Sequence, residues 1–364
     1  MACQADLCAP LRSEDSQQGV ASRSVGSVVE VHRIPPDGEG RPALRIWFSS
    51  PVSNEHLRPL IVFIHGGGLF SKATTYLPWF ERRFCRACAT SGKVCIEVDY
   101  PLSLLPSGLY ILPSCALSAL GILVIALSRA ATAKYIAGGI CALWLFVVFR
   151  MIWRDQHRVR HPQHLQACAK AVAWGETHAR DFGADPRHLV IWGHSSGGHL
   201  AALLSLCAST QGCELPYIPP IAGLAMLSAP LDYRPANLGR LNPLARLAIM
   251  TFLVWEPLGK DPNIWSSASP MTVLENGPAD VGSPAMPLLL IKSYEFWSSW
   301  LNRQADVLFR PEDAAAAARK LGFPTFCELI EGADHFSAIG RCQRLLDESC
   351  EFWQLTARRA AVLG

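Results

Sequence analysis

The chain has 364 residues; half of them are hydrophobic, 17% are charged, and the formal net charge at pH 7 is +3. This length suits one large domain with an appendage. The small net charge, with no nucleic-acid-binding motif, argues against a nucleic-acid partner. The 13 cysteines are scattered and odd in number, which excludes a simple disulfide framework.

The first 27 residues differ in character from the rest of the chain. Residues 1–27 are polar and serine-rich and lack the apolar core of a signal peptide, so we expect a disordered tail. Residues 28–364 are expected to form a single domain. It opens with two strands, Ser27–Ile34 and Ala43–Ser49, which pair antiparallel around a turn rich in proline and glycine.

A glycine-rich loop follows the next strand. The apolar, β-branched run Leu60–Ile64 predicts a buried strand, and it leads directly into His65, Gly66, Gly67 and Gly68. A loop of this form places backbone N–H groups where they can stabilise the oxyanion of an acyl-transfer reaction. We therefore predict that Gly66, Gly67 and Gly68 contribute to an oxyanion hole.

A hydrophobic segment interrupts the domain after the strand Val94–Val98. Residues 109–127 and 135–149 are two largely apolar runs joined by a short connection. The first is close to the roughly 20 residues that span a bilayer as a helix. Because a helix expected over 164–181 continues the domain, we predict residues 104–160 to be an inserted membrane hairpin, either spanning or re-entrant. A buried hairpin of a soluble protein is the alternative.

The charges that flank this hairpin predict its orientation. Four arginines follow its exit and only two basic residues lie in its connection: Arg150, Arg154, Arg158 and Arg160 against Arg129 and Lys134. Under the positive-inside rule this places the catalytic domain in the cytosol. We expect an integral or monotopic protein of an intracellular membrane, and we favour the endoplasmic reticulum.

The most specific motif is a second glycine-rich turn. Leu189–Trp192 predicts a strand, residues 193–198 read Gly-His-Ser-Ser-Gly-Gly, and residues 199–206 are good helix formers. The G-x-S-x-G spacing is typical of a nucleophile elbow, a sharp strand-to-helix turn that exposes a serine hydroxyl. It predicts Ser195 as the nucleophile and the Ser196 N–H as an oxyanion donor, and it indicates a serine hydrolase.

A long excursion separates the elbow from the remaining strands. Residues 232–270 contain a strongly apolar centre, Leu241–Trp255. We expect this segment to form a cap or lid that lines the acyl pocket and touches the bilayer. A cap helix that only packs over the sheet is the plainer interpretation, and the two are compatible.

The general base must be a histidine, and His335 fits best. It follows the strand-like run Thr325–Ile330, where a triad in the chain order Ser, acid, His places its base. His65, His194 and His199 lie beside the two glycine-rich turns, and we expect structural roles for them. His335 is therefore the predicted base.

Two acidic residues compete for the third position of the triad, after the strand Leu288–Ile291. Glu295 follows that strand directly. Asp306 comes later, with room for one helix and one strand before His335. The third member must orient the imidazole of the base, and we favour Asp306 over Glu295 for this role.

The chain resembles the α/β-hydrolase fold family, on the hormone-sensitive-lipase-like side that includes arylacetamide deacetylases and carboxylesterases. The resemblance rests on five motifs: His65-Gly-Gly-Gly68, Asp99-Tyr-Pro-Leu102, Gly193-His-Ser-Ser-Gly-Gly198, Asp306-Val-Leu308 and Asp334-His-Phe336. The histidine before Ser195 is also similar to that of kynurenine formamidases and isoprenylcysteine methylesterases. The resemblance implies an α/β fold with a mainly parallel central sheet flanked by helices, here carrying the hydrophobic hairpin and the cap.

These features together predict a membrane-associated serine hydrolase that cleaves lipophilic carboxylic esters through an acyl-enzyme, with Ser195, Asp306 and His335 as its triad. No cofactor or metal is implied, and the expected partners are a small lipophilic ester and the lipid bilayer. The alternatives are an amidase or formamidase and a prenylcysteine methylesterase on the same fold. A catalytically silent ligand-binding or scaffold protein is the alternative of another class.

Overall fold

The computed structural model describes residues 28–53, 55–69, 78–103, 159–207, 215–277, 286–295, 307–335 and 337–363, together with eight isolated positions between 104 and 158. The predicted tail, residues 1–27, lies outside the described residues. So does nearly all of the predicted hairpin, residues 104–160.

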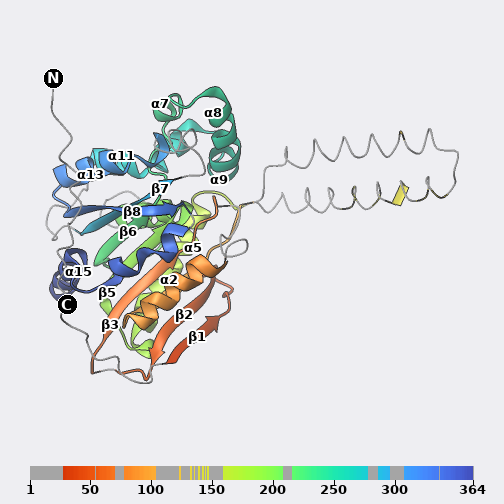
Figure 1. Cartoon of the computed structure of the whole chain (residues 1–364). Helices are drawn as coiled ribbons and strands as arrows, with labels where there is room; N and C mark the ends of the chain where they lie inside the picture. Colours follow the sequence, from red (N-terminus) through yellow and green to blue (C-terminus); the bar gives the residue numbers. More distant parts are fainter. Residues whose placement is uncertain are drawn as a thin grey trace.

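One mainly parallel sheet forms the centre of the molecule (Figure 1). Its eight strands lie in the order β1-β2-β4-β3-β5-β6-β7-β8. They are β1 (Val28–Ile34), β2 (Ala43–Ser50), β3 (Arg58–Ile64), β4 (Val94–Asp99), β5 (Ala184–His194), β6 (Gly223–Leu227), β7 (Leu288–Glu295) and β8 (Thr325–Asp334). Only β2 runs against both of its neighbours, so the opening pair is antiparallel and the other strands are parallel.

Helices cover both faces of the sheet. One face packs against α2 (Pro78–Thr90), α14 (Ser337–Gly340), a 3₁₀ turn at Cys342–Leu346 and α15 (Glu351–Val362). The other face packs against α5 (Gln163–His178), α6 (Ser196–Cys207), α11 (Pro270–Asn276) and α13 (Pro311–Lys320). A 3₁₀ turn at Ala179–Phe182 follows α5. This three-layer arrangement confirms the predicted α/β-hydrolase fold.

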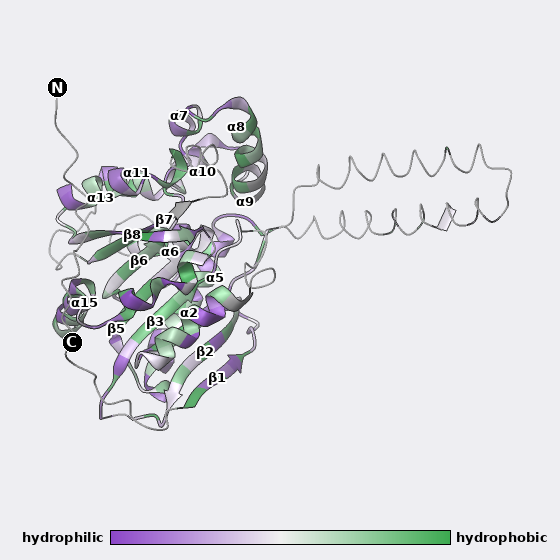
Figure 2. Cartoon of the chain, in the orientation of Figure 1, coloured by the Kyte–Doolittle hydropathy of each residue, from purple (hydrophilic) through white to green (hydrophobic). Residues whose placement is uncertain are grey.

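Strand β3 shows why the central strands are apolar throughout. Leu60, Val62 and Ile64 pack into the core on one side of the sheet, and Ile61 and Phe63 pack into the core on the other. Successive side chains of a strand point to opposite faces, so a strand covered on both faces carries no polar alternation. Figure 2 shows this as hydrophobic colour along the middle strands.

The segment predicted as a cap folds as a group of short helices at the top of the molecule in Figure 1. It comprises α7 (Pro235–Leu238), α8 (Pro243–Ile249), a π-helical turn at Met250–Trp255, α9 (Glu256–Leu258) and α10 (Pro262–Ser267). The side chain of Asn242 accepts the N–H of Ala245 at 2.9 Å and so begins α8. The cap has its own core, which includes Tyr233, Val254 and Leu308.

None of the helices in the described part of the chain combines the length and the hydrophobicity that crossing a bilayer requires. The predicted hairpin contributes only isolated positions to this description. Three of them are large apolar residues that are helical and exposed: Leu123 at 51%, Tyr135 at 80% and Phe146 at 60%.

Candidate active site

Ser195 lies on a sharp turn between β5 and α6. Its φ of 53° is in the left-handed region, which side chains other than glycine rarely adopt. Two backbone hydrogen bonds hold it there. Its N–H is donated to the carbonyl oxygen of Leu227 at 2.8 Å, and its carbonyl oxygen accepts the N–H of His199 at 3.1 Å. The strained serine, presented between a strand and a helix, has the geometry of a nucleophile elbow.

The glycines of the elbow are required by close backbone packing. A Cβ at Gly197 would lie 2.1 Å from the carbonyl oxygen of Ile64, and one at Gly193 would lie 2.4 Å from the carbonyl oxygen of Gly197. Neither contact can be relieved by moving a flexible side chain, since both involve backbone atoms. The elbow therefore packs directly against the end of β3.

His335, the predicted base, follows β8, and its ring lies against Ser195. Its Nε2 lies 3.0 Å from the Ser195 hydroxyl oxygen, and its side chain is buried. Burial and the neighbouring His194 ring hold the pKa of His335 well below its usual value. A low pKa keeps the imidazole unprotonated, and an unprotonated imidazole can accept the serine proton.

The predicted oxyanion loop leaves the end of β3 beside the elbow. Gly67 and Gly68 have positive φ values of 127° and 67°, which favour glycine. The N–H of Gly66 is donated to a carboxylate oxygen of Glu81 at 3.0 Å, so Gly66 supports the loop rather than facing an oxyanion. Gly67, Gly68 and Ser196 remain the predicted donors.

His65, which begins this loop, has a structural role. The His65 ring stacks on Tyr100 with 4.3 Å between centroids and an angle of 14°, and the Tyr100 hydroxyl donates to the His65 carbonyl oxygen at 3.0 Å. Nδ1 of His65 lies 2.7 Å from the Gly66 carbonyl oxygen. These contacts fix the curvature of the loop against the end of β4.

The two candidate acids remain predictions. Asp306 lies outside the described residues. The backbone of Glu295 ends β7 opposite Asp334 of β8, and its side chain lies outside the description. Three residues beyond Asp306, the Phe309 ring stacks on His335 with 5.9 Å between centroids and an angle of 9°.

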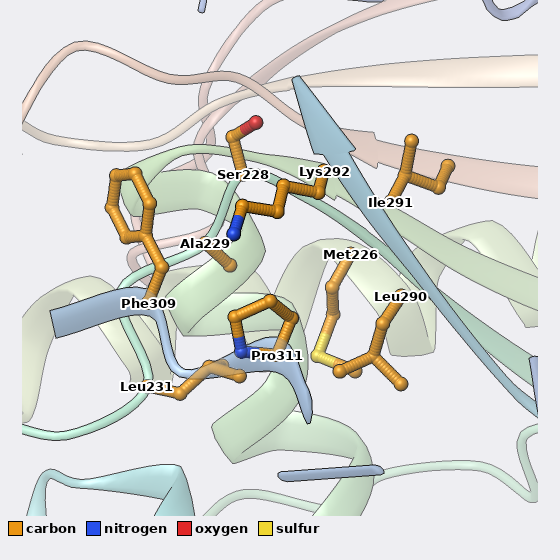
Figure 3. A pocket seen from close by; sticks show the side chains of 9 residues that line it. All are labelled: Met226, Ser228, Ala229, Leu231, Leu290, Ile291, Lys292, Phe309 and Pro311. Carbon is orange, nitrogen blue, oxygen red and sulfur yellow. The ribbon is translucent and has the colours of Figure 1, made fainter. Parts of the chain in front are cut away.

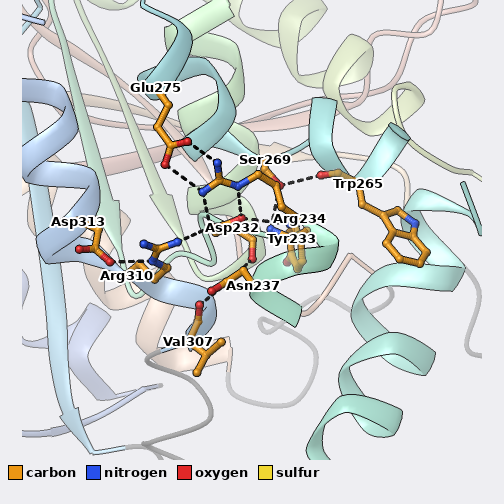
Figure 4. A network of polar contacts seen from close by, with 10 residues as sticks. All are labelled: Asp232, Tyr233, Arg234, Asn237, Trp265, Ser269, Glu275, Val307, Arg310 and Asp313. Carbon is orange, nitrogen blue, oxygen red and sulfur yellow. Dashed lines mark hydrogen bonds and ion pairs between the residues drawn. The ribbon is translucent and has the colours of Figure 1, made fainter. Parts of the chain in front are cut away.

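A buried ionic network holds this neighbouring segment in place (Figure 4). The Asp232 carboxylate is fully buried and accepts from Arg310 at 2.6 Å and from Arg234 at 2.7 Å. The backbone N–H groups of Leu231 and Asp232 are both donated to the Leu308 carbonyl oxygen. The start of the cap and the segment after Asp306 are therefore joined.

A small cavity lies next to this segment (Figure 3). Its walls are mostly apolar, with Met226, Leu290 and Phe309 among them, and its volume of about 10 Å³ admits a single water molecule. It is too small for an acyl chain. In the part of the chain that the structure describes, no group of three or more His, Cys, Asp or Glu side chains is placed to bind a metal ion.

Two contributors to the site were missed at the sequence level, Glu81 and Asp232. Glu81 lies on the same stripe of α2 as Phe84, Cys85 and Cys88, which are buried in the core. An acidic residue on an apolar helix stripe is a detectable signal, because burial of a charge requires partners. Asp232 carries no comparable local signal, since one of its two arginine partners, Arg310, comes from a distant segment.

A mostly parallel sheet with a serine at the elbow after β5 and a histidine after β8 is the arrangement of the α/β-hydrolase fold. The BD-FAE family model matches residues 137–221. The chain is 26% identical over 121 residues to esterase LipQ of Mycobacterium tuberculosis, and 35% identical over 63 residues to its probable carboxylic ester hydrolase LipM. These matches cover 33% and 17% of this chain but only 28% and 14% of the relatives.

Solved structures of esterases share the fold. Esterase B from Lactobacillus rhamnosis has a TM-score of 0.60 at 14% identity, covering 92% of this chain and 88% of that one. A thermostable esterase from Pseudomonas putida has a TM-score of 0.53 at 16% identity, covering 92% and 83%. These structures confirm the α/β-hydrolase fold that the motifs predicted.

The ionic network leads to a prediction. Asp232→Ala leaves two arginines without their buried partner, so we expect the free energy of unfolding to fall by about 3 kcal/mol. Asp313→Ala removes the exposed partner of the same Arg310 and should cost at most about 1 kcal/mol. Thermal unfolding of both variants checks this. Equal destabilisation by the two would contradict the role given to Asp232.

Proposed function

We propose that this protein is a membrane-associated serine hydrolase that cleaves lipophilic carboxylic esters. The observation that carries the proposal is the 3.0 Å contact between the Ser195 hydroxyl and Nε2 of His335 at a strained elbow. The esterase relatives support the choice of an ester as substrate. A silent binding protein is disfavoured, because it has no use for a strained serine aligned with a buried, unprotonated histidine.

The reaction would proceed in two steps. Ser195 Oγ attacks the ester carbonyl carbon while Nε2 of His335 takes the serine proton, and the carbonyl oxygen becomes an oxyanion facing the predicted donors, Gly67, Gly68 and Ser196. His335 then returns the proton to the departing alkoxide, which leaves as the alcohol. Water, activated by His335, releases the acid from the acyl-enzyme. Asp306, as the predicted third member, would orient the imidazole.

The surface of α8 supports contact with a lipid bilayer. Leu244 and Leu247 are 70% and 57% exposed. Arg240 and Arg246 are exposed beside them, and residues 240–255 contain no acidic side chain. An apolar face flanked by cationic groups is typical of a helix that lies in the interface of an anionic membrane.

The predicted hairpin would anchor the protein beside this cap. The described residues at its two ends meet, because the Ser103 hydroxyl donates to the Val159 carbonyl oxygen at 2.7 Å. The N–H of His161 is donated to Pro257 of α9 at 2.7 Å, so the base of the insertion adjoins the cap. The arginines that follow the hairpin support an intracellular membrane location with the catalytic domain in the cytosol.

The proposed activity is tested by hydrolysis of p-nitrophenyl esters from acetate to palmitate in detergent. We expect Ser195→Ala to reduce kcat at least about 10⁴-fold, since removal of a triad nucleophile leaves only the remaining site. Asp306→Asn should reduce kcat by a comparable factor, and Glu295→Gln should change it less than threefold. The reverse order for the two acids would assign the triad to Glu295.

Parallel assays on formyl amides and prenylcysteine methyl esters distinguish the neighbouring chemistries. If the protein hydrolysed formyl amides or prenylcysteine methyl esters faster than every acyl ester, the substrate class would change but the Ser195 mechanism would stand. A wild-type protein that hydrolyses none of them and takes up no fluorophosphonate would contradict a serine hydrolase altogether.

The α8 surface gives a second prediction. Leu244→Asp with Leu247→Asp should reduce hydrolysis of a long-chain ester in anionic vesicles at least about fivefold, because charged groups are poorly accommodated at the acyl boundary. Hydrolysis of soluble p-nitrophenyl acetate should stay within twofold. Val28→Asp with Val31→Asp, two exposed valines on the far edge strand β1, is the matched control. A loss shared by both substrates, or by the control, would argue against membrane contact through α8.

A further inference from the structure

A buried carboxylate beside the elbow has no part in the proposed reaction steps. Glu81 lies in the first turn of α2 and is only 1% exposed. Its Oε1 accepts the N–H of Gly66 at 3.0 Å and lies 3.6 Å from Nδ1 of His194, a side chain that is 2% exposed. This carboxylate therefore touches both the oxyanion loop and the residue before the nucleophile.

The position of Glu81 is fixed by the packing of α2. Phe84, one turn further along the helix, packs against Phe63 of β3 with 5.0 Å between ring centroids and against Trp192 of β5 with 4.9 Å. These strands are the ones that end in the oxyanion loop and the elbow. The helix that carries Glu81 is thus anchored to the two strands whose ends it must align.

His194 connects this carboxylate to the catalytic histidine. Its Nε2 lies 2.8 Å from the backbone carbonyl oxygen of His335, and the two rings are 5.1 Å apart. A Cβ at Gly66 would lie 2.9 Å from Nδ1 of His194, so the loop lies directly against the same ring. One imidazole therefore contacts the loop, the elbow and the turn that carries the base.

The orientation of the His194 ring follows from its two polar neighbours. A carbonyl oxygen only accepts hydrogen bonds, so Nε2 of His194 donates to the His335 carbonyl oxygen. Nδ1 then faces Glu81 Oε1 at 3.6 Å, a close polar contact that is too long for a hydrogen bond. The ring is therefore held between the Glu81 carboxylate and the turn that carries His335.

We propose that Glu81 and His194 form a positioning pair that keeps the oxyanion loop and the His335 turn aligned with Ser195. The pair acts through its neighbours and touches neither substrate nor reacting atoms. The inference rests on the proposed serine hydrolase function and adds to it the device that aligns three separate segments: the loop after β3, the elbow after β5 and the turn after β8.

The titratable groups beside the pair come from α2, from the residue after β4 and from the turn after β8. Glu81 of α2 and the ring of His335 face His194. Cys85 and Tyr100 lie within reach of the Glu81 charge, and burial raises the pKa of both, that of Cys85 to about 12, so both stay neutral. Besides burial, His194 holds the pKa of His335 down. Removing His194 should therefore raise the pKa of His335.

The first test is Glu81→Gln in the full-length protein in detergent, with active sites counted by fluorophosphonate labelling. Glutamine keeps an oxygen for the Gly66 N–H but lacks the carboxylate charge beside His194. We expect kcat per labelled site to fall at least about tenfold with KM within threefold. Glu97→Gln is the matched control, because Glu97 of β4 is also a buried carboxylate, and it pairs with Arg45 of β2 at 2.9 Å. This substitution should leave kcat per labelled site within twofold.

The second test is the pH profile of His194→Gln. His335 works as a base only when unprotonated, so kcat/KM falls as the pH drops through its pKa. A higher pKa of His335 moves this acid limb to higher pH, and we expect a shift of at least half a pH unit, about threefold in proton affinity. His188→Gln, elsewhere on β5 and bonded to Thr356 at 2.9 Å, should leave the acid limb in place.

The outcomes separate positioning from bulk stability. If Glu81→Gln and His194→Gln leave fewer labelled sites, each with wild-type kcat and an unmoved acid limb, the pair is merely structural and the inference is overturned. If Glu81→Gln fails to accumulate, Glu81→Asp replaces it: its carboxylate is one methylene shorter, so a reduced kcat supports the pair and a wild-type kcat contradicts it. A wild-type protein without labelling or turnover would refute the proposed function instead.

Discussion

The site depends on one close approach of backbone, between the end of β3 and the elbow after β5. Gly197 passes so near the carbonyl oxygens of Ile64 and His65 that no side chain fits. Ser195 is held at a positive φ, at a cost of about 1–3 kcal/mol, which the buried strands on either side offset. Because β3 and β5 are neighbours in the sheet, the loop and the nucleophile are brought together by the same pairing that forms the core.

The base of the predicted insertion and the cap adjoin the oxyanion loop. The N–H of Ser103 is donated to Leu69 in the oxyanion loop at 2.7 Å, and the Ser103 hydroxyl is donated to Val159 across the base of the insertion. The loop, the insertion and the cap therefore share one junction. In the proposed function, an ester that leaves the bilayer reaches Ser195 through this junction without crossing much water.

The central strands and both glycine-rich turns were predictable because their signals are local. Leu60–Ile64 and Leu189–Trp192 are apolar throughout since both faces are buried, and the glycines around Ser195 mark a turn that tolerates no Cβ. Strand β5 begins earlier than predicted, at Ala184, because Ala184 and Asp185 pair with Arg58 and Pro59 after a shift in register. Such an irregularity has no sequence signature.

The rest of the site is decided by contacts between distant segments. Glu81 meets His194 only because α2 packs across β3 and β5, and Asp232 meets Arg310 only because the cap begins beside the segment after Asp306. The choice between Asp306 and Glu295 is of the same kind, since both follow β7 and only the fold decides which one reaches His335. Local pattern therefore predicted a nucleophile and a base that the structure brings together, but it left the acid open.

The most direct test of the account is the site of covalent modification in the wild-type protein. A fluorophosphonate should react with one residue, and peptide mass spectrometry should find the added mass on the peptide that contains Ser195, with no labelling in Ser195→Ala. Labelling that persists in Ser195→Ala, or that lies on another residue, would contradict the central claim that the elbow carries the nucleophile.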